Sequence, residues 1–319
     1  LMKVESNGGI SIRYLYEMLE GQVAILSSGF LNNSEVADLL DALRASKMYR
    51  KDQNSYTLYP DRQLDRFTEK NNIPVEMAEK SELIKKLVNG NDRNIVLKDV
   101  KGNLHFNGAF RNAAMLRDSL DKLKTNYKEL VEKDYQLILD IFEKIFDHQS
   151  FTGRSGTFYK YEGLGCIYWH MVSKLLLVVE ENFQNAYYLK ADKKTLKKLA
   201  AHFYDIQAGI GIKKTPALYG AFPTDPYSHT PGHAGAQQPG MTGQVKEDII
   251  TRFGELGVRV KDGEISFRPL LLNREEYLSS PQRFEYYNIS GKLKIIELQK
   301  NSLAFTFCQV PVVYSISAG

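Results

Sequence analysis

The sequence predicts a mainly α fold: an (α/α) toroid, whole or partial, followed by a small C-terminal antiparallel β-sheet domain. Apolar residues recur at helical spacing through the first four fifths of the chain, in segments joined by elaborate loops. From Gly257 onward the apolar period shortens from about 3.6 to about 2 residues. No repeat at a period of roughly 30–45 residues is visible, which argues against a solenoid. We therefore expect residues 1–256 to form the helical domain and residues 257–319 the sheet domain.

Each expected helix has an amphipathic or apolar pattern, and several have end signals. The pattern covers residues 12–26, 35–45, 76–88, 116–146, 167–183, 193–206 and 245–256. Ser28 and Gly29 end the first of these, and Asn33 with Ser34 can cap the second. Asn89 and Gly90 end the third. Segment 116–146 is long enough for one helix or two, and 167–183 is apolar on most sides, which predicts a buried helix.

Strands are expected in two places. Residues 95–106 are typical of a short hairpin with its turn near 101–103. In the last fifth, alternation at 258–260, 265–267, 293–295 and 304–307 predicts strands, with Gly263 and Gly291 in turns.

Composition excludes several classes of protein. The 319 residues are 43% hydrophobic and 25% charged, with a net charge of +4, which is ordinary for a folded protein. The cluster formed by Lys193, Lys194, Lys197 and Lys198 is expected to be a solvated helix face, because nucleic-acid binding needs a broader basic surface. The most apolar stretch, 167–179, contains His170 and is too short and polar to span a bilayer. We expect neither nucleic-acid nor membrane partners.

Cysteine usage and motifs point to no cofactor. Cys166 and Cys308 are expected to be separate thiols rather than a disulfide, and no metal-ligand spacing is present. No P-loop, dinucleotide fingerprint or nucleophile elbow is found. We predict no metal and no cofactor. No signal peptide is visible and cytoplasm and periplasm both stay open; the abrupt start suggests a piece of a longer protein.

The most informative stretch runs from Tyr219 to Gln244. It combines Gly and Pro with histidines, glutamines and aromatic rings, directly before a predicted helix. Long loops of this kind usually build sites. Flat rings beside amides and imidazoles suit a sugar, which has apolar faces and a rim of hydroxyls. The alternative is an ordered connector without a ligand.

Three further loops, at 52–62, 105–112 and 153–170, have the same mixture of residues. We expect Tyr161, Trp169 and Tyr227 to stack on sugar rings. The predicted hydroxyl-binding residues are Gln53, Arg62, His229, Gln237 and Gln238. Alternatively, Trp169 and His170 are packed core residues, and Asp61 with Arg62 is only a salt bridge.

Cleavage of a glycosidic bond needs two carboxyl groups, or one acid and an attacking water or phosphate. The polar loops contain Asp52, Asp61, Glu162 and Asp225, and the following helix contains Glu247 and Glu255. Glu162 is the preferred candidate, because it lies between a tyrosine and glycines in the most site-like loop. Asp61 is the second catalytic candidate.

Several motifs resemble the C-terminal half of inverting glycoside phosphorylases of the cellobiose phosphorylase type. They are Glu162-Gly-Leu-Gly-Cys-Ile-Tyr-Trp-His170, Met241-Thr-Gly-Gln244, and the strand-like run from Leu256 to Pro269. Residues 20–29 are weakly similar to another segment of that family. The resemblance implies an (α/α)6 barrel with β-sandwich elements, and it places His170, Thr242 and Gly243 at phosphate-binding positions.

Two departures leave the reaction open. Gln244 stands where the family has Ser or Thr, and no Trp follows it. The family's general-acid Asp would fall before residue 1, so its proton donor is expected upstream. We therefore expect a carbohydrate-active enzyme, or part of one, that cleaves β-linked glucans or oligosaccharides with inversion, by phosphorolysis or hydrolysis. His170 and Thr242 would hold the attacking phosphate or water. The alternative function is a non-catalytic sugar-binding or scaffold module. Oligosaccharide and phosphate are the expected partners, with a missing N-terminal part or a second copy of the chain as others.

Overall fold

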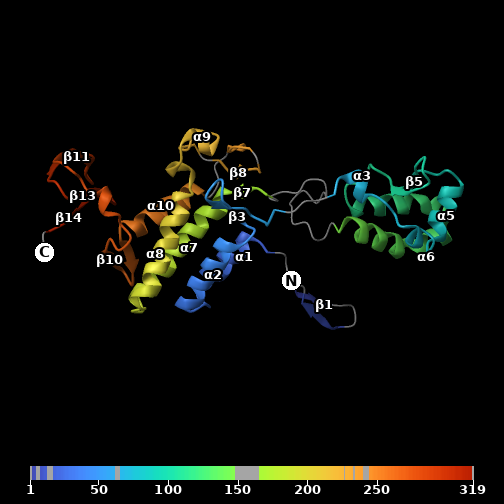
Figure 1. Cartoon of the computed structure of the whole chain (residues 1–319), viewed down its shortest axis with the longest axis horizontal. Helices are drawn as coiled ribbons and strands as arrows, with labels where there is room; N and C mark the ends of the chain where they lie inside the picture. Colours follow the sequence, from blue (N-terminus) through green and yellow to red (C-terminus); the bar gives the residue numbers. More distant parts are fainter. Residues whose placement is uncertain are drawn as a thin grey trace.

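The protein has two separate hydrophobic cores. In Figure 1 the helices α3 to α6 stand apart from the other helices of the chain. The computed structural model describes residues 2–4, 8–12, 17–61, 65–147, 165–225, 227–232, 234–239 and 244–317. One core takes its buried side chains from residues 19–56 and 167–271, and the other takes them from residues 73–146. We call residues 17–61 with 165–317 the first unit, and residues 65–147 the second unit. A short hairpin of β1 (Met2–Val4) and β2 (Ile10–Ile12) precedes them.

Helices form the centre of the first unit. They are α1 (Leu19–Ser27), α2 (Asn33–Ala45), α7 (Trp169–Tyr188) and α8 (Lys193–Ala208). The apolar α7 packs against α1 and α8, and α2 packs against α8. Asn32 and Glu35 form a capping box at the start of α2, and Asp192 caps α8, so each cap satisfies backbone N–H groups in the first turn of its helix.

Short strands and turns lie beside the start of α7. Strands β3 (Tyr49–Arg50) and β4 (Ser55–Tyr56) form one hairpin, and β7 (Ile167–Tyr168) pairs with β8 (His229–Thr230). The short helices η2 (Gly211–Lys213) and α9 (Pro216–Tyr219) lie in the chain between α8 and β8. A Cβ at Gly220 would lie 2.3 Å from the Cα of Gly235, so the Tyr219–Gln238 loop folds tightly back on itself.

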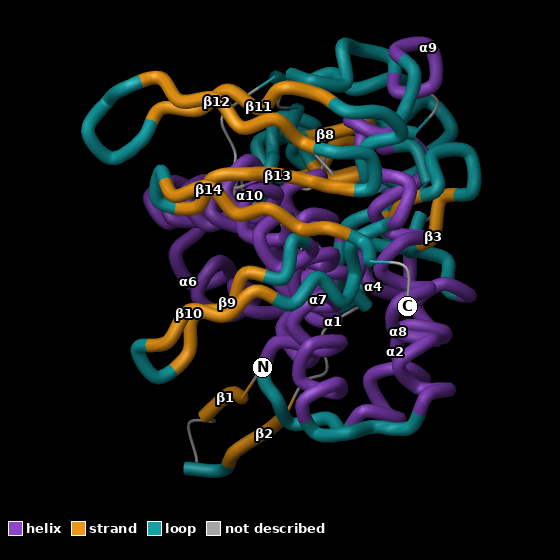
Figure 2. Tube along the Cα trace, turned by 90° about the vertical axis from the view of Figure 1, so that its left-hand side faces the viewer, coloured by secondary structure: helices purple, strands orange, loops and turns teal. Residues whose placement is uncertain are grey.

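Three hairpins follow α10 (Gln244–Glu255), one above another in Figure 2. They are β9 (Val258–Lys261) with β10 (Glu264–Phe267), β11 (Gln282–Tyr287) with β12 (Leu293–Leu298), and β13 (Ser302–Phe307) with β14 (Val310–Ser315). A short η3 helix (Arg274–Glu276) precedes β11. The hydroxyl of Tyr314 donates to the Leu256 carbonyl at 2.6 Å, which ties β14 to the end of α10.

Helix α10 buries its polar side rather than its apolar side. Glu247, Thr251 and Glu255, spaced four residues apart, are each 3% exposed. Ile249 and Ile250 are 53% and 45% exposed. The amphipathic pattern therefore predicted the helix correctly but gives no guide to which side faces α7.

The contact between α7 and α10 buries a carboxyl group. Glu180 on α7 is 5% exposed, and a Cβ at Gly254 of α10 would lie 2.3 Å from its Oε1, so only glycine allows this approach. Burial raises the pKa of Glu180 from 4.5 to about 7, and a hydrogen bond from Gln184 opposes the rise. The folded protein therefore favours the neutral acid.

Glu180 should make the stability of the first unit depend on pH. Because the folded pKa lies above the unfolded value, its contribution is complete below pH 4.5 and is lost as the pH rises to about 7. We compare the free energy of unfolding of Glu180→Gln with that of the wild type at two pH values. Between pH 4.5 and pH 8 the difference should move in favour of the variant by about 3 kcal/mol. Urea unfolding followed by the fluorescence of Trp169 measures this. Glu264→Gln, at an exposed strand position, is the control; the same pH-dependent gain there would refute the assignment.

The second unit has its own helices and hairpin. They are α3 (Phe67–Lys70), α4 (Val75–Ala78), α5 (Glu82–Asn89) and α6 (Ala113–Phe146), with β5 (Val96–Lys98) and β6 (Leu104–Phe106). Helix α6 is interrupted at Tyr127, whose φ of −138° is not helical. Phe106, Phe142 and Phe146 form an aromatic cluster in the core of the second unit.

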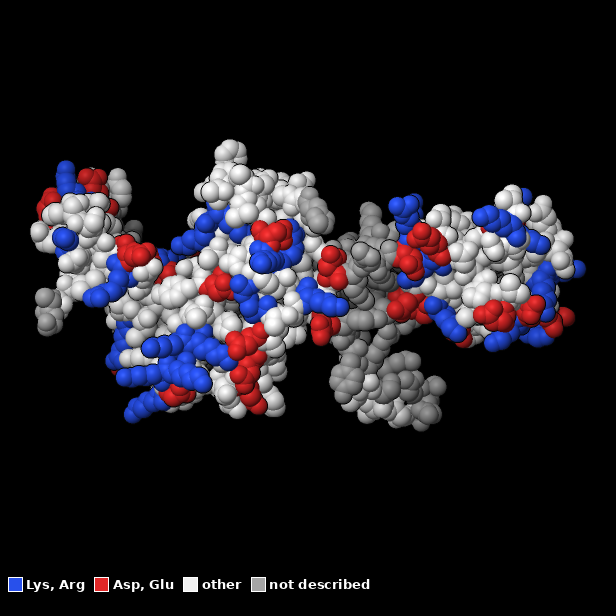
Figure 3. Space-filling model, in the orientation of Figure 1, with Lys and Arg blue, Asp and Glu red and all other residues white. Residues whose placement is uncertain are grey.

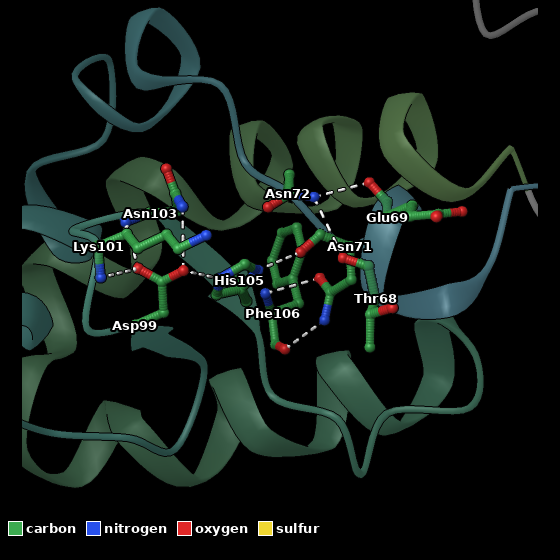
Figure 4. Close-up of polar contacts among 9 residues, drawn as sticks. All are labelled: Thr68, Glu69, Asn71, Asn72, Asp99, Lys101, Asn103, His105 and Phe106. Atoms are coloured by element: carbon green, nitrogen blue, oxygen red, sulfur yellow. Dashed lines mark hydrogen bonds and ion pairs between the residues drawn. The ribbon is translucent and has the colours of Figure 1, made fainter.

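Polar contacts hold the β5–β6 hairpin to the segment after α3 (Figure 4). The Asn103 side chain donates to Asp99, as do the backbone N–H groups of Asn103 and Lys101, and these bonds lower the pKa of Asp99 to about 2. His105 lies between the Asn71 carbonyl and the Asp99 carboxylate. The side chain of Asn71 pairs with both backbone groups of Phe106, so this cluster has a structural role.

The mainly α class is confirmed, as are the hairpin at 95–106 and the strands at 258–260, 265–267, 293–295 and 304–307. Two helix predictions need correction. The first helix begins at Leu19 rather than Ile12, which pairs in β2, and 76–88 divides where Ser81 caps α5. Strands β11 and β14 were not predicted. The (α/α) toroid and the division at residue 256 stay predictions.

The lysine cluster on α8 is a solvated surface. Figure 3 shows blue side chains gathered over one end of the first unit, next to red ones. Lys198 forms ion pairs with Asp38 and Asp41 of α2 at 3.1 and 2.6 Å. Among the described residues no helix has the length and apolar character needed to cross a membrane.

Candidate functional site

The β7–β8 pairing brings together two of the loops that the sequence singled out. Tyr168 lies opposite His229, and Ile167 opposite Thr230. The backbone N–H of Trp169 donates to the Ser228 carbonyl at 3.0 Å. Segments about sixty residues apart in the chain therefore meet at the first turn of α7.

His170 lies in this first turn, and its side chain is 20% exposed. Its Nδ1 is 3.3 Å from the Tyr168 hydroxyl, and its Nε2 is 3.6 Å from Oε1 of Glu247 in the first turn of α10. The imidazole thus has a neutral hydroxyl on one side and a carboxylate on the other. A partly exposed imidazole with fixed neighbours can contact a ligand.

Glu247 provides a buried carboxyl group beside His170. Its side chain is 4% exposed, and Nζ of Lys246 lies 3.5 Å from Oε1. Within the described part of the chain, its Oε2 has no hydrogen-bond partner. In the sequence, Glu247 was one of several acidic residues and was not selected. Its spacing of four residues from Thr251, and of eight from Glu255, marks the buried side of α10. This polar spacing opposes the apolar pattern of the helix, so it was not recognised.

Tyr168 connects His170 to the opposite strand. Its ring stacks on His229 with centroids 4.8 Å apart and planes 8° from parallel. Nδ1 of His229 is 3.3 Å from the sulfur of Cys166. Burial raises the pKa of Cys166 to about 11, so the sulfur is a thiol at neutral pH and not an activated nucleophile.

Trp169 packs in the core and has no exposed ring face, which leaves no room for a sugar on it here. It is 0% exposed, its Nε1 donates to Thr230 at 2.8 Å, and its ring meets Tyr219 edge-on. The ammonium of Lys214 lies 4.8 Å from the Trp169 ring centroid. Burial, reinforced by the charge of Arg50, lowers the pKa of Lys214 to about 8.

Gln53 is also a buried residue, and both its amide nitrogen and its amide oxygen are hydrogen-bonded. It is 6% exposed, donates to the Leu218 carbonyl at 2.8 Å and accepts from Lys214 at 3.0 Å. In this conformation it braces α9 and does not offer its amide to a sugar. The neighbouring Arg50 pairs with Asp52 and donates to the Thr230 and Pro231 carbonyls.

The other described candidates lie around the β7–β8 hairpin. Tyr227 is partly buried against Tyr219. Gln237 and Gln238 pair with β8 and Ser228 through their backbones, while their side chains are exposed. Asp61 is exposed, and its Oδ1 would lie 2.9 Å from a Cβ at Gly165, so a side chain there would meet the carboxylate.

Five candidates lie outside the described residues: Arg62, Tyr161, Glu162, Thr242 and Gly243. The structure thus brings His170 and His229 together, with Gln237 beside β8, and adds Tyr168 and Glu247, which the sequence did not select. No group of three metal-ligating side chains forms within the described ranges.

A pocket of about 330 Å³ adjoins Glu247. It lies between α1 and α7, where Glu20, Lys174 and Glu181 provide its charged groups. Val23, Met171 and Val178 give it an apolar wall, so it is amphipathic.

A comparison with protein families matches residues 64–149 to the family described as "GH149 phosphorylase insertion domain 2". The matched segment coincides with the second unit and its separate core. This match relates the protein to the glycoside phosphorylases, a class of carbohydrate-active proteins. It does not single out the cellobiose phosphorylase type. No curated protein matches the chain.

Proposed function

We propose that the first unit is part of a carbohydrate-active enzyme that cleaves β-linked glucans or oligosaccharides by phosphorolysis with inversion. The observation that carries this proposal is His170, a partly exposed imidazole held between Tyr168 and Glu247 at the start of α7. The match of the second unit to a phosphorylase insertion domain favours phosphate over water as the attacking group.

The reaction exchanges one bond for another at the anomeric carbon. An oxygen of phosphate attacks this carbon from the face opposite the leaving sugar, while a carboxylic acid protonates the leaving oxygen. The products are a sugar 1-phosphate of inverted configuration and a shortened acceptor. In this proposal His170, Thr242 and Gly243 bind phosphate. Asp61 and Glu162 remain candidates for carboxylates that contact the sugar or supply the proton.

Sugar contacts would come from side chains of the loops. Tyr161 and Tyr227 would provide rings, and Arg62, Gln237 and Gln238 would provide donors. His229 would lie beside the sugar, because its ring stacks on that of Tyr168. Residues 1–256 would form the helical toroid and residues 257–319 the sheet domain. An upstream segment or a second copy of the chain would be a partner.

A product screen tests the proposal. The chain, and a version extended upstream, are incubated with β-glucan oligosaccharides with and without phosphate. Sugar phosphate formed only when phosphate is present is the expected result. Free sugar in both conditions would show a hydrolase instead. A rise in melting temperature without turnover in either version would favour the non-catalytic sugar-binding or scaffold module, and neither shift nor turnover would reject a carbohydrate function for these substrates.

A further inference from the structure

We propose that Glu247 is a positioning residue that holds Nε2 of His170, so that Nδ1 and the Tyr168 hydroxyl together face the attacking phosphate. The inference rests on the proposed function and names how the phosphate would be recognised. It adds two residues, one that acts through His170 and one that contacts the ligand.

Glu247 is buried beside His170. A carboxylate that is 4% exposed has lost most of its hydration, and such groups are retained where a partner compensates. Among the described residues, Nε2 of His170 lies 3.6 Å and Nζ of Lys246 lies 3.5 Å from Oε1. Lys246 has a side chain that is 71% exposed and is therefore screened by water, which leaves His170 as the partner fixed by packing.

This placement bears on the two ring nitrogens of His170. When Nε2 carries its proton toward Glu247, Nδ1 is the nitrogen available to another group. In the structure Nδ1 and the Tyr168 hydroxyl are hydrogen-bonded to each other at 3.3 Å, so a bound phosphate must replace this bond. At 3.6 Å, Oε1 of Glu247 lies beyond hydrogen-bond distance of Nε2, and the nearby carboxylate favours the tautomer that carries the proton on Nε2.

Contacts of its backbone and its ring hold Tyr168 in place. Its backbone pairs with His229 in the β7–β8 ladder, and its ring stacks on the imidazole of that residue. These contacts hold the hydroxyl beside Nδ1 without using the oxygen. Together the two groups form a fixed donor–acceptor pair.

This pair matches hydrogen phosphate. When phosphate replaces the hydrogen bond between the two groups, Nδ1 can accept the P–O–H proton and the Tyr168 hydroxyl can donate to a second phosphate oxygen. Because the proposed function places phosphate, and not sugar, at His170, loss of Glu247 should weaken phosphate binding and leave sugar binding largely intact.

The experiment compares Glu247→Gln and Tyr168→Phe with Glu255→Gln. Glu255 is an equally buried acid two turns further along α10, but it pairs with Gln207 and Arg252, away from His170. In the extended enzyme we expect Glu247→Gln to raise KM for phosphate roughly 10- to 100-fold, and Tyr168→Phe to raise it about 10-fold. The KM for oligosaccharide should change less than about 2-fold in both, and Glu255→Gln should change neither constant.

A second readout needs no activity. The protein has six histidines, so 15N-histidine labelling with a His170→Asn variant for assignment gives the tautomer of His170 directly. The wild type should show the proton on Nε2, and Glu247→Gln should show a mixture of tautomers. An unchanged tautomer, an unchanged phosphate KM, or an equal rise in Glu255→Gln would overturn the inference. If the wild type lacked phosphorolysis, the proposed function would fail, and the tautomer measurement would still decide whether Glu247 positions His170.

Discussion

His170→Ala should lower kcat/KM for phosphate roughly 100- to 1,000-fold in the extended enzyme, which is the usual cost of removing one polar group that stabilises a transition-state anion. His170 is partly exposed and has fixed polar neighbours on both ring nitrogens. Its removal should leave the melting temperature within a few degrees, because the side chain is not part of the buried core. Steady-state kinetics with phosphate as the varied substrate measures the effect.

The matched control is His202→Ala. His202 also lies on a helix beside a carboxylate, with Nε2 2.8 Å from Asp41, but it is on α8 and faces α2. It should keep the full rate. If His170→Ala retained the wild-type phosphate dependence, or if both variants lost activity equally, His170 would not be the phosphate ligand.

Asp134→Ala should destabilise the second unit by roughly 2–4 kcal/mol, because it leaves buried donors without an acceptor. Asp134 is 3% exposed, and its Oδ2 accepts from the Ser81 hydroxyl at 2.7 Å and from the Leu83 N–H at 2.8 Å. Ser81 in turn caps α5 by accepting from Ile84. One carboxylate on α6 therefore satisfies the start of α5.

The position of the tryptophan separates the two units in this measurement. Trp169, the single Trp of the chain, is buried in the first core, so its fluorescence reports on that core alone. Far-UV circular dichroism reports on both. Asp134→Ala should introduce or advance a dichroism transition at low urea while the fluorescence midpoint stays in place. Asp140→Ala, an exposed site on the same helix, should change neither, and a shift of the fluorescence midpoint in Asp134→Ala would contradict two independent cores.

Local patterns were sufficient to predict most helices. The apolar run that became α7 and the stripe on α8 are buried as expected, because long helices acquire their stability from packing an apolar face. The hairpin at 95–106 also follows from local turn chemistry, since Gly102 has a φ of +94° and Asp99 closes the turn.

Tertiary contacts decide what the sequence could not show. The apolar spacing of segment 76–146 is the same whether it belongs to the first core or to its own, so the separate second unit was not predicted. Glu247 was not selected from the sequence because α10 packs with its polar side inward. The usual amphipathic pattern places acidic residues on the exposed side of a helix. Trp169 and Gln53 were chosen for residue type, and their burial depends on Thr230, Leu218 and Lys214, which lie far along the chain.

The central claim is that phosphate attacks the anomeric carbon at the site built around His170. Proton NMR of the extended enzyme with a β-linked glucan oligosaccharide and phosphate tests it most directly. The account predicts an α-configured sugar 1-phosphate as the first product, equal in amount to the bonds cleaved and absent from His170→Ala. A free reducing sugar without a phosphate ester, or a β-configured phosphate, would contradict it.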